Sequence, residues 1–315
     1  MRYHQVSGGA GSWLAAKVDM AANPNEEHRF VFTDVLYEDA DAYRFLIEST
    51  ANLLGRRLNW TIPQADDFPD YRVSEETPIE EYRGNQEWRA FLADLRADTA
   101  LAMPELIWLA DGRDPWEVFR DERFLGNSRV DPCSKKLKRE SIARWRKANC
   151  NQEEDVFLVG IGPHEKHRYD DGEGGGIGPR MEAKGWTFEA PLLGTMEGEF
   201  GPFGYLADAG IVRPRLYRKG YIHNNCGGFC CKAGHAHWVN RLRVDPDRFA
   251  YDRIMEQKMR EYLGSDVSML TSTVAGDKQP LTLAQLESRV TANPQLTFDY
   301  EPGASGCGCM LEDAA

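Results

Sequence analysis

The sequence predicts an α/β protein built around a parallel β-sheet, and two observations carry that prediction. The first is the order of elements: a short strand over residues 3–6, a glycine loop, a helix over 13–22 and a buried strand over 29–33. A strand, a helix and a further strand form the crossover unit that joins parallel strands. The second is composition, because 42% hydrophobic and 28% charged residues in a chain of 315 suit a buried core.

Later segments extend the same pattern. Residues 39–54 carry apolar side chains at helical spacing, and the alternation over 57–62 predicts a third strand. Residues 63–130 are less regular, and we interpret them as a helical insertion. A basic helix is expected over 134–148 and a central strand over 155–161. Towards the C-terminus, helices are expected over 246–263 and 281–290.

The loop after the first strand reads SGGAGS and predicts a phosphate site. Glycine lets backbone N–H groups approach an anion without a Cβ clash, and the start of the following helix adds partial positive charge. The loop has neither the Lys of a Walker A motif nor the acidic partner of a dinucleotide fingerprint. The alternative is a plain turn between strand and helix. The expected contacts are Ser7, Gly8, Gly9, Gly11 and Ser12.

This loop resembles the SGGxDS PP-loop of the adenine-nucleotide alpha-hydrolase-like (HUP-type) superfamily, although Gly11 stands where that motif has Asp. The segment 32–38 (FTDVLYE) resembles the second-strand segment of phosphoadenosine-phosphosulfate (PAPS) reductases. Segments 133–138 (CSKKLK) and 160–168 (GIGPHEKHR) resemble later parts of that family. The resemblance to its phage-type, PAPS-reductase-like branch implies a Rossmann-like PP-loop fold, bound ATP or a related adenine nucleotide with Mg²⁺, and Asp34 beside the adenosine.

Seven cysteines in a chain without a secretory signal favour metal binding or redox chemistry over disulfides. Cys226 and Cys230 lie four residues apart with glycines between them, so both can bind one metal or one cluster edge. Cys133 is a plausible third ligand. The resemblance to cluster-containing thiolation enzymes implies a [4Fe–4S] cluster on these three thiolates, with one iron open. Zinc on Cys226, Cys230, His235 and His237 is the alternative, with His223 as another candidate ligand, and buried thiols without a metal are a third interpretation.

Further residues are candidates for chemistry. If Cys133 is not a ligand, it is the best candidate nucleophile, because the neighbouring lysines favour its thiolate. Arg168 and Arg215 have the forked geometry that suits phosphate or sulfate, and a surface ion pair is the alternative for each. Cys307 and Cys309 near the C-terminus are expected either to supply a fourth ligand or to resolve a persulfide or disulfide, unless they belong to an irrelevant tail.

The formal net charge of −12 argues against a general nucleic-acid coat. Two basic segments, 135–147 and 213–219, are interpreted as facing one anionic substrate, with solvated surfaces as the alternative. No apolar run reaches the roughly 18 residues that a membrane span needs, and the N-terminus carries no signal pattern. We therefore expect a cytoplasmic protein with no membrane partner, in the host cytoplasm if a phage encodes it.

Together these features predict a PP-loop domain over residues 1–195, with its insertion at about 63–130, and a Cys-rich C-terminal extension over 196–315. The expected function is adenylating, ATP-dependent sulfur transfer to a tRNA base, to DNA or to a small molecule. A sulfur or electron donor protein and a homodimer are the expected partners. PAPS reduction is one alternative, although the family's ECGLH sequence is absent. A nucleotide- or metal-binding regulator without turnover is another, weakly favoured by Gly11.

Overall fold

The computed structural model describes residues 1–195, 201–274 and 276–298. At its centre lies a five-stranded, all-parallel sheet with the strand order β3-β2-β1-β4-β5. The strands are β1 (Arg2–Val6), β2 (His28–Asp34), β3 (Leu106–Ala110), β4 (Val156–Leu158) and β5 (Thr187–Glu189). The predicted α/β class with a parallel sheet is therefore confirmed.

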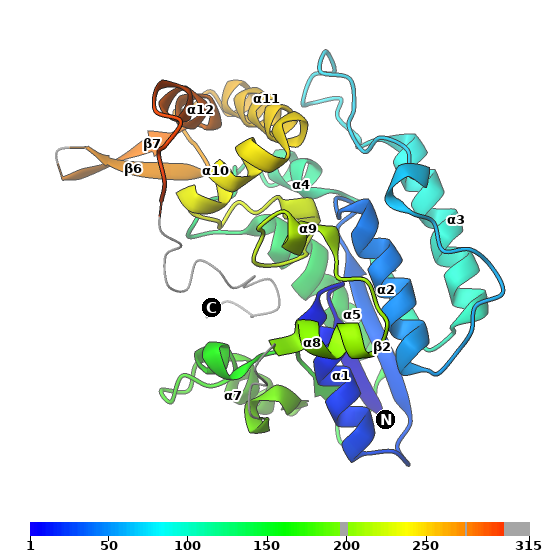
Figure 1. Cartoon of the computed structure of the whole chain (residues 1–315). Coiled ribbons are helices and arrows are strands. Elements are labelled where there is room, and N and C mark those ends of the chain that lie inside the picture. Colours follow the sequence, from blue (N-terminus) through cyan, green and yellow to red (C-terminus); the bar gives the residue numbers. More distant parts are fainter. Residues whose placement is uncertain (196–200, 275, 299–315) are drawn as a thin grey trace.

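Helices cover both faces of the sheet, which gives three layers (Figure 1). One face is covered by α1 (Ala10–Ala22), α2 (Ala40–Leu53) and α3 (Gln86–Ala102). The other face is covered by α5 (Ser141–Asn149) and α7 (Ile177–Glu182). The basic helix predicted over 134–148 is present as α5 together with the π-helical segment η2 (Ser134–Glu140) that precedes it. Because both faces are covered, β2 buries five residues in succession rather than every second one.

The third strand is not where the sequence analysis placed it, so that prediction is wrong. Residues 57–62 form no strand, although their side chains do alternate between exposed and partly buried. Leu58, Trp60 and Ile62 pack against the main core while this segment has no strand beside it. The third strand is β3, which pairs with β2 and lies inside the supposed helical insertion 63–130. That range also contains η1 (Ala65–Asp67), α3 and α4 (Pro115–Asp121).

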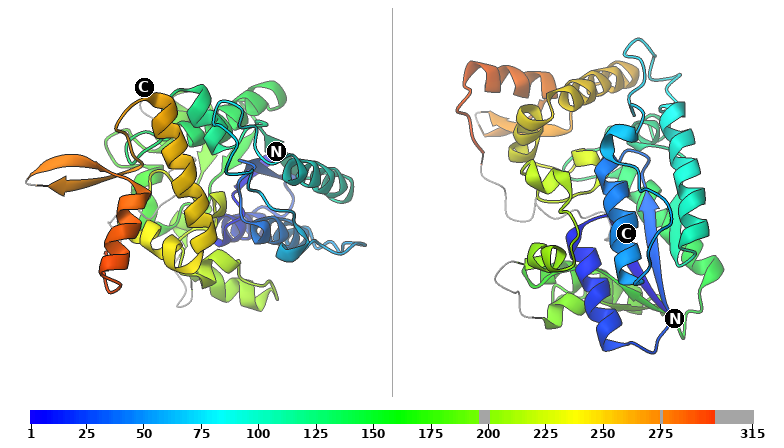
Figure 2. Two further views of the ribbon diagram at one scale, coloured as in Figure 1. Left: turned by 90° about the horizontal axis from the view of Figure 1, so that it is seen from above. Right: turned by 45° about the vertical axis from the view of Figure 1, so that its right-hand side comes forward.

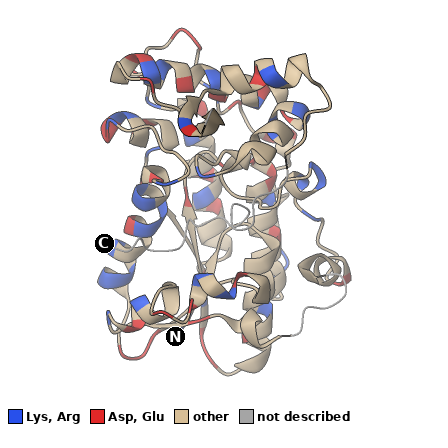
Figure 3. Cartoon of the chain, turned by 90° about the vertical axis from the view of Figure 1, so that its left-hand side faces the viewer, with Lys and Arg blue, Asp and Glu red and all other residues tan. Residues whose placement is uncertain are grey.

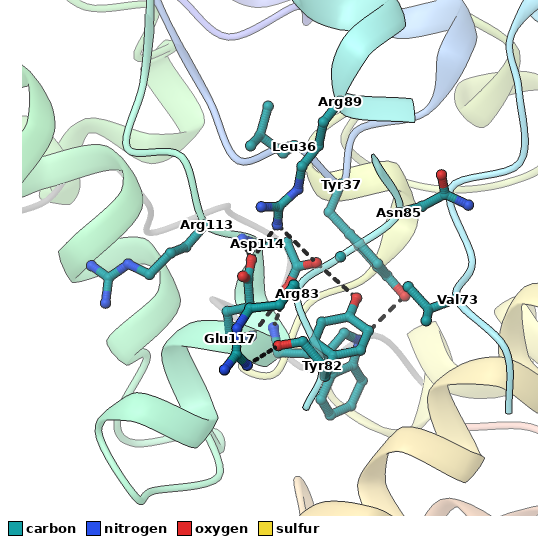
Figure 4. A network of polar contacts seen from close by, with 12 residues as sticks. Leu36, Tyr37, Val73, Tyr82, Arg83, Asn85, Arg89, Arg113, Asp114 and Glu117 are labelled. Carbon is teal, nitrogen blue, oxygen red and sulfur yellow. Dashed lines mark hydrogen bonds and ion pairs between the residues drawn. The ribbon is translucent and has the colours of Figure 1, made fainter. Parts of the chain in front are cut away.

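A buried polar network ties the segment before α3 to the start of α4 (Figure 4). The Tyr82 hydroxyl donates to Asp114 Oδ2 at 2.7 Å, and Arg89 forms an ion pair with Glu117. Asp114 also caps α4, because its Oδ1 accepts the Trp116 and Glu117 amides at 2.9 and 3.0 Å. Burial raises the pKa of Asp114 to about 6. These contacts hold the inserted segments against the sheet.

Helices α10 (His235–Val244), α11 (Pro246–Leu263) and α12 (Leu283–Ala292) pack at one end of the layered unit (Figure 2). Helix α8 (Gly201–Asp208) instead packs against α1, and α9 (Arg215–Arg218) follows it in the chain. The helices predicted over 246–263 and 281–290 are thus confirmed as α11 and α12. The antiparallel hairpin of β6 (Leu270–Val274) and β7 (Asp277–Leu281) was not predicted. None of the described helices has the length and apolar character needed to cross a bilayer.

The remaining short elements connect these parts. They are η3 (Pro163–Glu165), α6 (Lys166–Tyr169), η4 (Pro191–Gly194) and η5 (Cys226–Gly228). Lys and Arg positions alternate with Asp and Glu positions along much of the ribbon in Figure 3.

Candidate functional site

A cavity of about 580 Å³ opens at the carboxyl ends of β1 and β4. These two strands are neighbours, but the chain runs outward from β1 through β2 and β3 before it returns to β4. In open parallel sheets, ligands bind at such a reversal of strand order. The lining comes from Ser7, Gly9, Gly11 and Ser12 on one side and from residues 159–161 on the other. Four of the five predicted loop contacts therefore face this cavity.

Internal hydrogen bonds hold the glycine loop in shape. Ser12 Oγ donates to the Gly9 carbonyl at 3.0 Å and accepts the Ser7 amide at 3.2 Å. Gly8, the fifth predicted contact, does not line the cavity and instead makes the turn, with φ +71°. Its carbonyl accepts a hydrogen bond from Asn224 Nδ2 at 2.7 Å. The loop is thus tied to the C-terminal part of the chain.

Two glycines near the loop have opposite packing requirements. A Cβ on Gly160 would lie 2.6 Å from Ser12 Cα and 2.8 Å from Ser12 N, so the segment after β4 touches the backbone of α1. A Cβ on Gly11 would meet only the Gly160 carbonyl, at 3.7 Å, which is an ordinary contact. Packing therefore requires glycine at position 160. It leaves room at position 11 for the start of a side chain, such as that of the Asp in the family motif.

The first amide of α1 already has a partner within the chain. The Ala10 N–H donates to the Tyr217 hydroxyl at 3.3 Å, and Tyr217 lines the cavity. Arg213 lies beside it, with its guanidinium carbon 3.7 Å from the centroid of the Phe203 ring. The α8–α9 region therefore closes the cavity over the loop with an aromatic wall and a cation.

The cavity carries a positive lining that suits an anion. Lys138, Arg168 and Arg213 all line it, and Arg168 also forms an ion pair with Glu165 on the same wall. The sequence analysis did not single out His223 for this cavity. Burial lowers the pKa of His223 to about 3, so its ring is neutral and offers a hydrogen bond rather than a charge. Its position just before the cysteine cluster was the available signal.

Asp34 lies elsewhere, although the family resemblance placed it beside the adenosine. Its carboxylate is buried and accepts the Leu36 amide at 2.7 Å, the Tyr43 hydroxyl at 2.9 Å and Trp108 Nε1–H at 3.0 Å. It is not part of the cavity lining. These three bonds fix the end of β2 against α2 and β3, so the contacts of Asp34 are those of a structural residue.

The two basic segments are brought to the cavity only in part. Of the basic residues in the first segment, Lys138 lines the cavity, and of those in the second segment, Arg213 lines it. Arg215, which the sequence analysis also proposed for an oxyanion, instead pairs with the buried carboxylate of Asp39 at 2.6 and 2.9 Å. The interpretation of both segments as a single substrate-facing surface is therefore too broad.

Four thiols line a second, smaller cavity beside the first. The structure brings Cys133 together with Cys226 and Cys230, and it adds Cys231, which is not among the predicted ligands. The Sγ atoms of Cys133 and Cys231 are 3.8 Å apart. Lys138 lines both this cavity and the larger one. The phosphate loop and the thiols thus face two spaces that share one lysine.

A strained turn presents Cys226. Both Cys226 and Gly227 have left-handed backbones, with φ +55° and +57°, and a Cβ on Gly227 would lie 2.6 Å from the Tyr37 carbonyl. The Gly227 carbonyl accepts hydrogen bonds from Arg241 Nη1 at 2.8 Å and Arg248 Nη1 at 3.2 Å. The C-terminal helices therefore clamp this turn against the segment after β2.

Charge at the thiol cavity is set by burial and by Lys138. Burial raises the pKa of Glu38 to about 7, and Lys138 Nζ lies 3.5 Å from Glu38 Oε1. The Cys226 thiol forms a hydrogen bond with Lys138, whose positive charge opposes the rise that burial causes in the pKa of Cys226. Burial also raises the pKa of Cys230, to about 11. Such thiols give up their protons when a metal binds them.

The described thiols are not gathered around a single point. In the described part of the chain, no three cysteine sulfurs lie within 4.8 Å of one another, as the ligands of a single ion would. The Cys₂His₂ alternative is not assembled: His237 Nε2 is bonded to the Gly228 carbonyl at 2.7 Å, and His235 stacks on Phe298.

Three cysteines remain to be placed. Cys307 and Cys309 lie outside the described residues. Cys150 ends α5 and packs against the core on the other face of the sheet, away from both cavities. It therefore serves as an internal reference for experiments on the thiol cavity.

Comparison with known proteins was negative. No family model matches the chain, and no curated protein matches it. The function is therefore argued from the geometry of the two cavities.

Proposed function

We propose that this chain is an ATP-dependent sulfur transferase of the PP-loop type. The observation that carries the proposal is the position of Lys138, which lines both the cavity of the glycine loop and the cavity of the thiols. A sulfur transferase needs an activating nucleotide and a sulfur source within reach of one acceptor. Two adjoining spaces with a shared cation meet that requirement.

The larger cavity supplies the nucleotide half of the reaction. Its volume of about 580 Å³ falls within the range of small-molecule sites. The loop amides and the start of α1 would bind the phosphates of ATP, accompanied by Mg²⁺. Arg168 and Lys138 would stabilise the negative charge that develops as an acceptor oxygen attacks the α-phosphorus and pyrophosphate leaves.

The smaller cavity supplies the sulfur half. Cys133, Cys226 and Cys230 would hold a [4Fe–4S] cluster, which would supply sulfide-level sulfur to the acceptor. The bond from sulfur to the activated acceptor atom would form as the bond from that atom to the AMP oxygen breaks. Lys138 directs the departing phosphate towards the glycine loop. Glu38, with a pKa of about 7, accepts or returns a proton beside it.

PAPS reduction is the second candidate, and one distance favours it. The Cys133 and Cys231 sulfurs are 3.8 Å apart, which suits a reducing dithiol. One thiolate would attack the sulfur of PAPS and displace adenosine bisphosphate. The second thiol would then attack the resulting thiosulfonate and release sulfite, leaving a disulfide that a donor protein must reduce.

Anaerobic purification separates the two candidates. The transferase predicts a brown protein with about four iron per chain, and Cys133→Ser should lose the iron whereas the matched control Cys150→Ser should keep it. Pyrophosphate release from ATP is then measured with candidate RNAs, and Ser7→Ala should reduce it. Colourless, iron-free protein that forms sulfite from PAPS would instead support the reductase.

A further inference from the structure

A second cluster of metal-ligand side chains lies towards the amino ends of β1 and β2, whereas the larger cavity lies at the carboxyl ends of the strands. Within the described residues, His4, Asp19 and His28 form the one group of three with ligand atoms close enough for a single ion. In the parallel pairing of β1 with β2, His28 is aligned with Arg2. His4 lies two residues beyond Arg2 and so points to the same face. Helix α1 returns over that face and adds Asp19.

We propose that His4, Asp19 and His28 form a structural binding site for a divalent transition-metal ion of the zinc class. His4 Nε2 and His28 Nδ1 are 3.0 Å apart, and they lie 3.6 and 3.7 Å from Asp19 Oδ2. A tetrahedral zinc ion with ordinary bonds to nitrogen and oxygen requires ligand separations of about 3.3–3.5 Å. The three atoms therefore need shifts of only a few tenths of an ångström to take an ion between them.

Protonation and charge at this cluster suit a cation. Two ring nitrogens 3.0 Å apart have room for at most one proton between them. His28 Nε2 is bonded to the Asn23 carbonyl at 2.9 Å, and this contact orients the ring with Nδ1 towards the site. Asp19 and Glu189 share one guanidinium, that of Arg2. Two carboxylates therefore face one guanidinium at this cluster.

The cluster is buried. His4 is 1% exposed and Asp19 is 3% exposed. His4 Nε2 faces His28 Nδ1 and the Asp19 carboxylate within the protein interior. Imidazole ligands select a transition metal over Mg²⁺ or Ca²⁺.

An ion here would join β1, β2 and α1, the three elements that position the glycine loop. Because metal ions bind the folded site and not the open chain, occupancy would raise the melting temperature of that unit. The proposal does not depend on sulfur transfer or on the thiol cavity. It concerns a separate set of ligands at the other end of the same strands.

The test is a Co²⁺ and Zn²⁺ titration of the full chain and of His28→Gln, with His167→Gln as the matched control at an exposed histidine of α6. Wild-type and control proteins should bind one equivalent more than His28→Gln. The Co²⁺ difference spectrum should show d–d bands without the near-ultraviolet charge-transfer band that thiolate ligands give. Affinity at this site should fall by about 10–100-fold or more in His28→Gln, because loss of outer contacts alone has that effect.

Wild-type protein offers a second measurement that needs no variant. With only seven histidines, a chain labelled with ¹⁵N-histidine gives a tractable spectrum, in which Zn²⁺ should shift the imidazole signals of His4 and His28 together. Equal metal stoichiometry in wild type and His28→Gln would overturn the proposal. So would Zn²⁺ that leaves both imidazole signals unchanged, and the cluster would then be a hydrogen-bonded histidine pair only.

Discussion

Replacing Gly160 by alanine should damage the fold at the phosphate loop more than replacing any other glycine that lines the larger cavity. The added Cβ would lie 2.6 Å from Ser12 Cα and 2.8 Å from Ser12 N. Carbon atoms in contact prefer separations of roughly 3.5–4.0 Å, so one backbone must move by about 1 Å. No rotamer change can relieve the clash, because both neighbours are main-chain atoms of α1.

The expected loss follows from the cost of overpacking a close-packed interior. Forcing an extra carbon into such a site costs about 1–3 kcal/mol, and a backbone neighbour places Gly160→Ala towards the upper end. The matched control is Gly11→Ala, whose Cβ meets the Gly160 carbonyl at an ordinary 3.7 Å. Gly11 lies in α1, so alanine there should leave stability unchanged or raise it by up to about 1 kcal/mol.

Urea unfolding followed by circular dichroism measures both variants against wild type. The midpoint of Gly160→Ala should fall with little change in slope, and that of Gly11→Ala should not fall. The same displacement moves the loop amides, so ATP should bind Gly160→Ala more weakly. If the two alanine variants unfold together with wild type, the close approach of the segment after β4 to α1 is wrong.

Three further predictions concern charges at the site. Arg168→Gln should weaken ATP binding by about tenfold or more with little change in unfolding, whereas Arg215→Gln should lower the unfolding free energy by about 1–3 kcal/mol and leave ATP affinity unchanged, because Asp39 loses its closest partner; calorimetry and urea unfolding measure the two effects. Lys138→Met should lower both ATP affinity and iron content, because Lys138 lines both cavities. If only one of the two properties falls, Lys138 does not couple the cavities. Burial raises the pKa of Glu38 from 4.5 to about 7, so the folded chain binds that proton more tightly than the unfolded chain does. The free energy of unfolding should therefore fall as the pH rises from 4.5 to about 7. Glu38→Gln should remove part of that fall, and an unchanged pH profile would contradict the assigned burial.

The elements found from sequence are those set by local pattern. The SGGAGS loop, the apolar run of β2 and the helix α11 each carry their signal within a few residues. The misplaced third strand shows the limit, because alternation over 57–62 describes which side chains are buried but not whether a neighbouring strand exists. β3 becomes a strand by pairing with β2, more than 70 residues earlier in the chain.

The candidate site was likewise found in part. The spacing of Cys226 and Cys230 in the sequence indicated that both could bind one ligand. Cys231 lines the same cavity because of a turn whose shape depends on the packing of Gly227. The His4 and His28 pair has no sequence motif at all, since its geometry comes from strand register. Asp34 was matched to a family position, yet three internal hydrogen bonds hold its carboxylate in the core.

The central claim is that nucleotide and thiols share one site through Lys138, and selective alkylation tests it most directly. Metal-free protein is treated with iodoacetamide with and without ATP, and the modification rate at each cysteine is read by mass spectrometry. Bound phosphate should draw the Lys138 charge away from Cys226, so ATP should slow its alkylation several-fold and leave Cys150 unchanged. ATP that binds without changing the rate at Cys226 would contradict the claim.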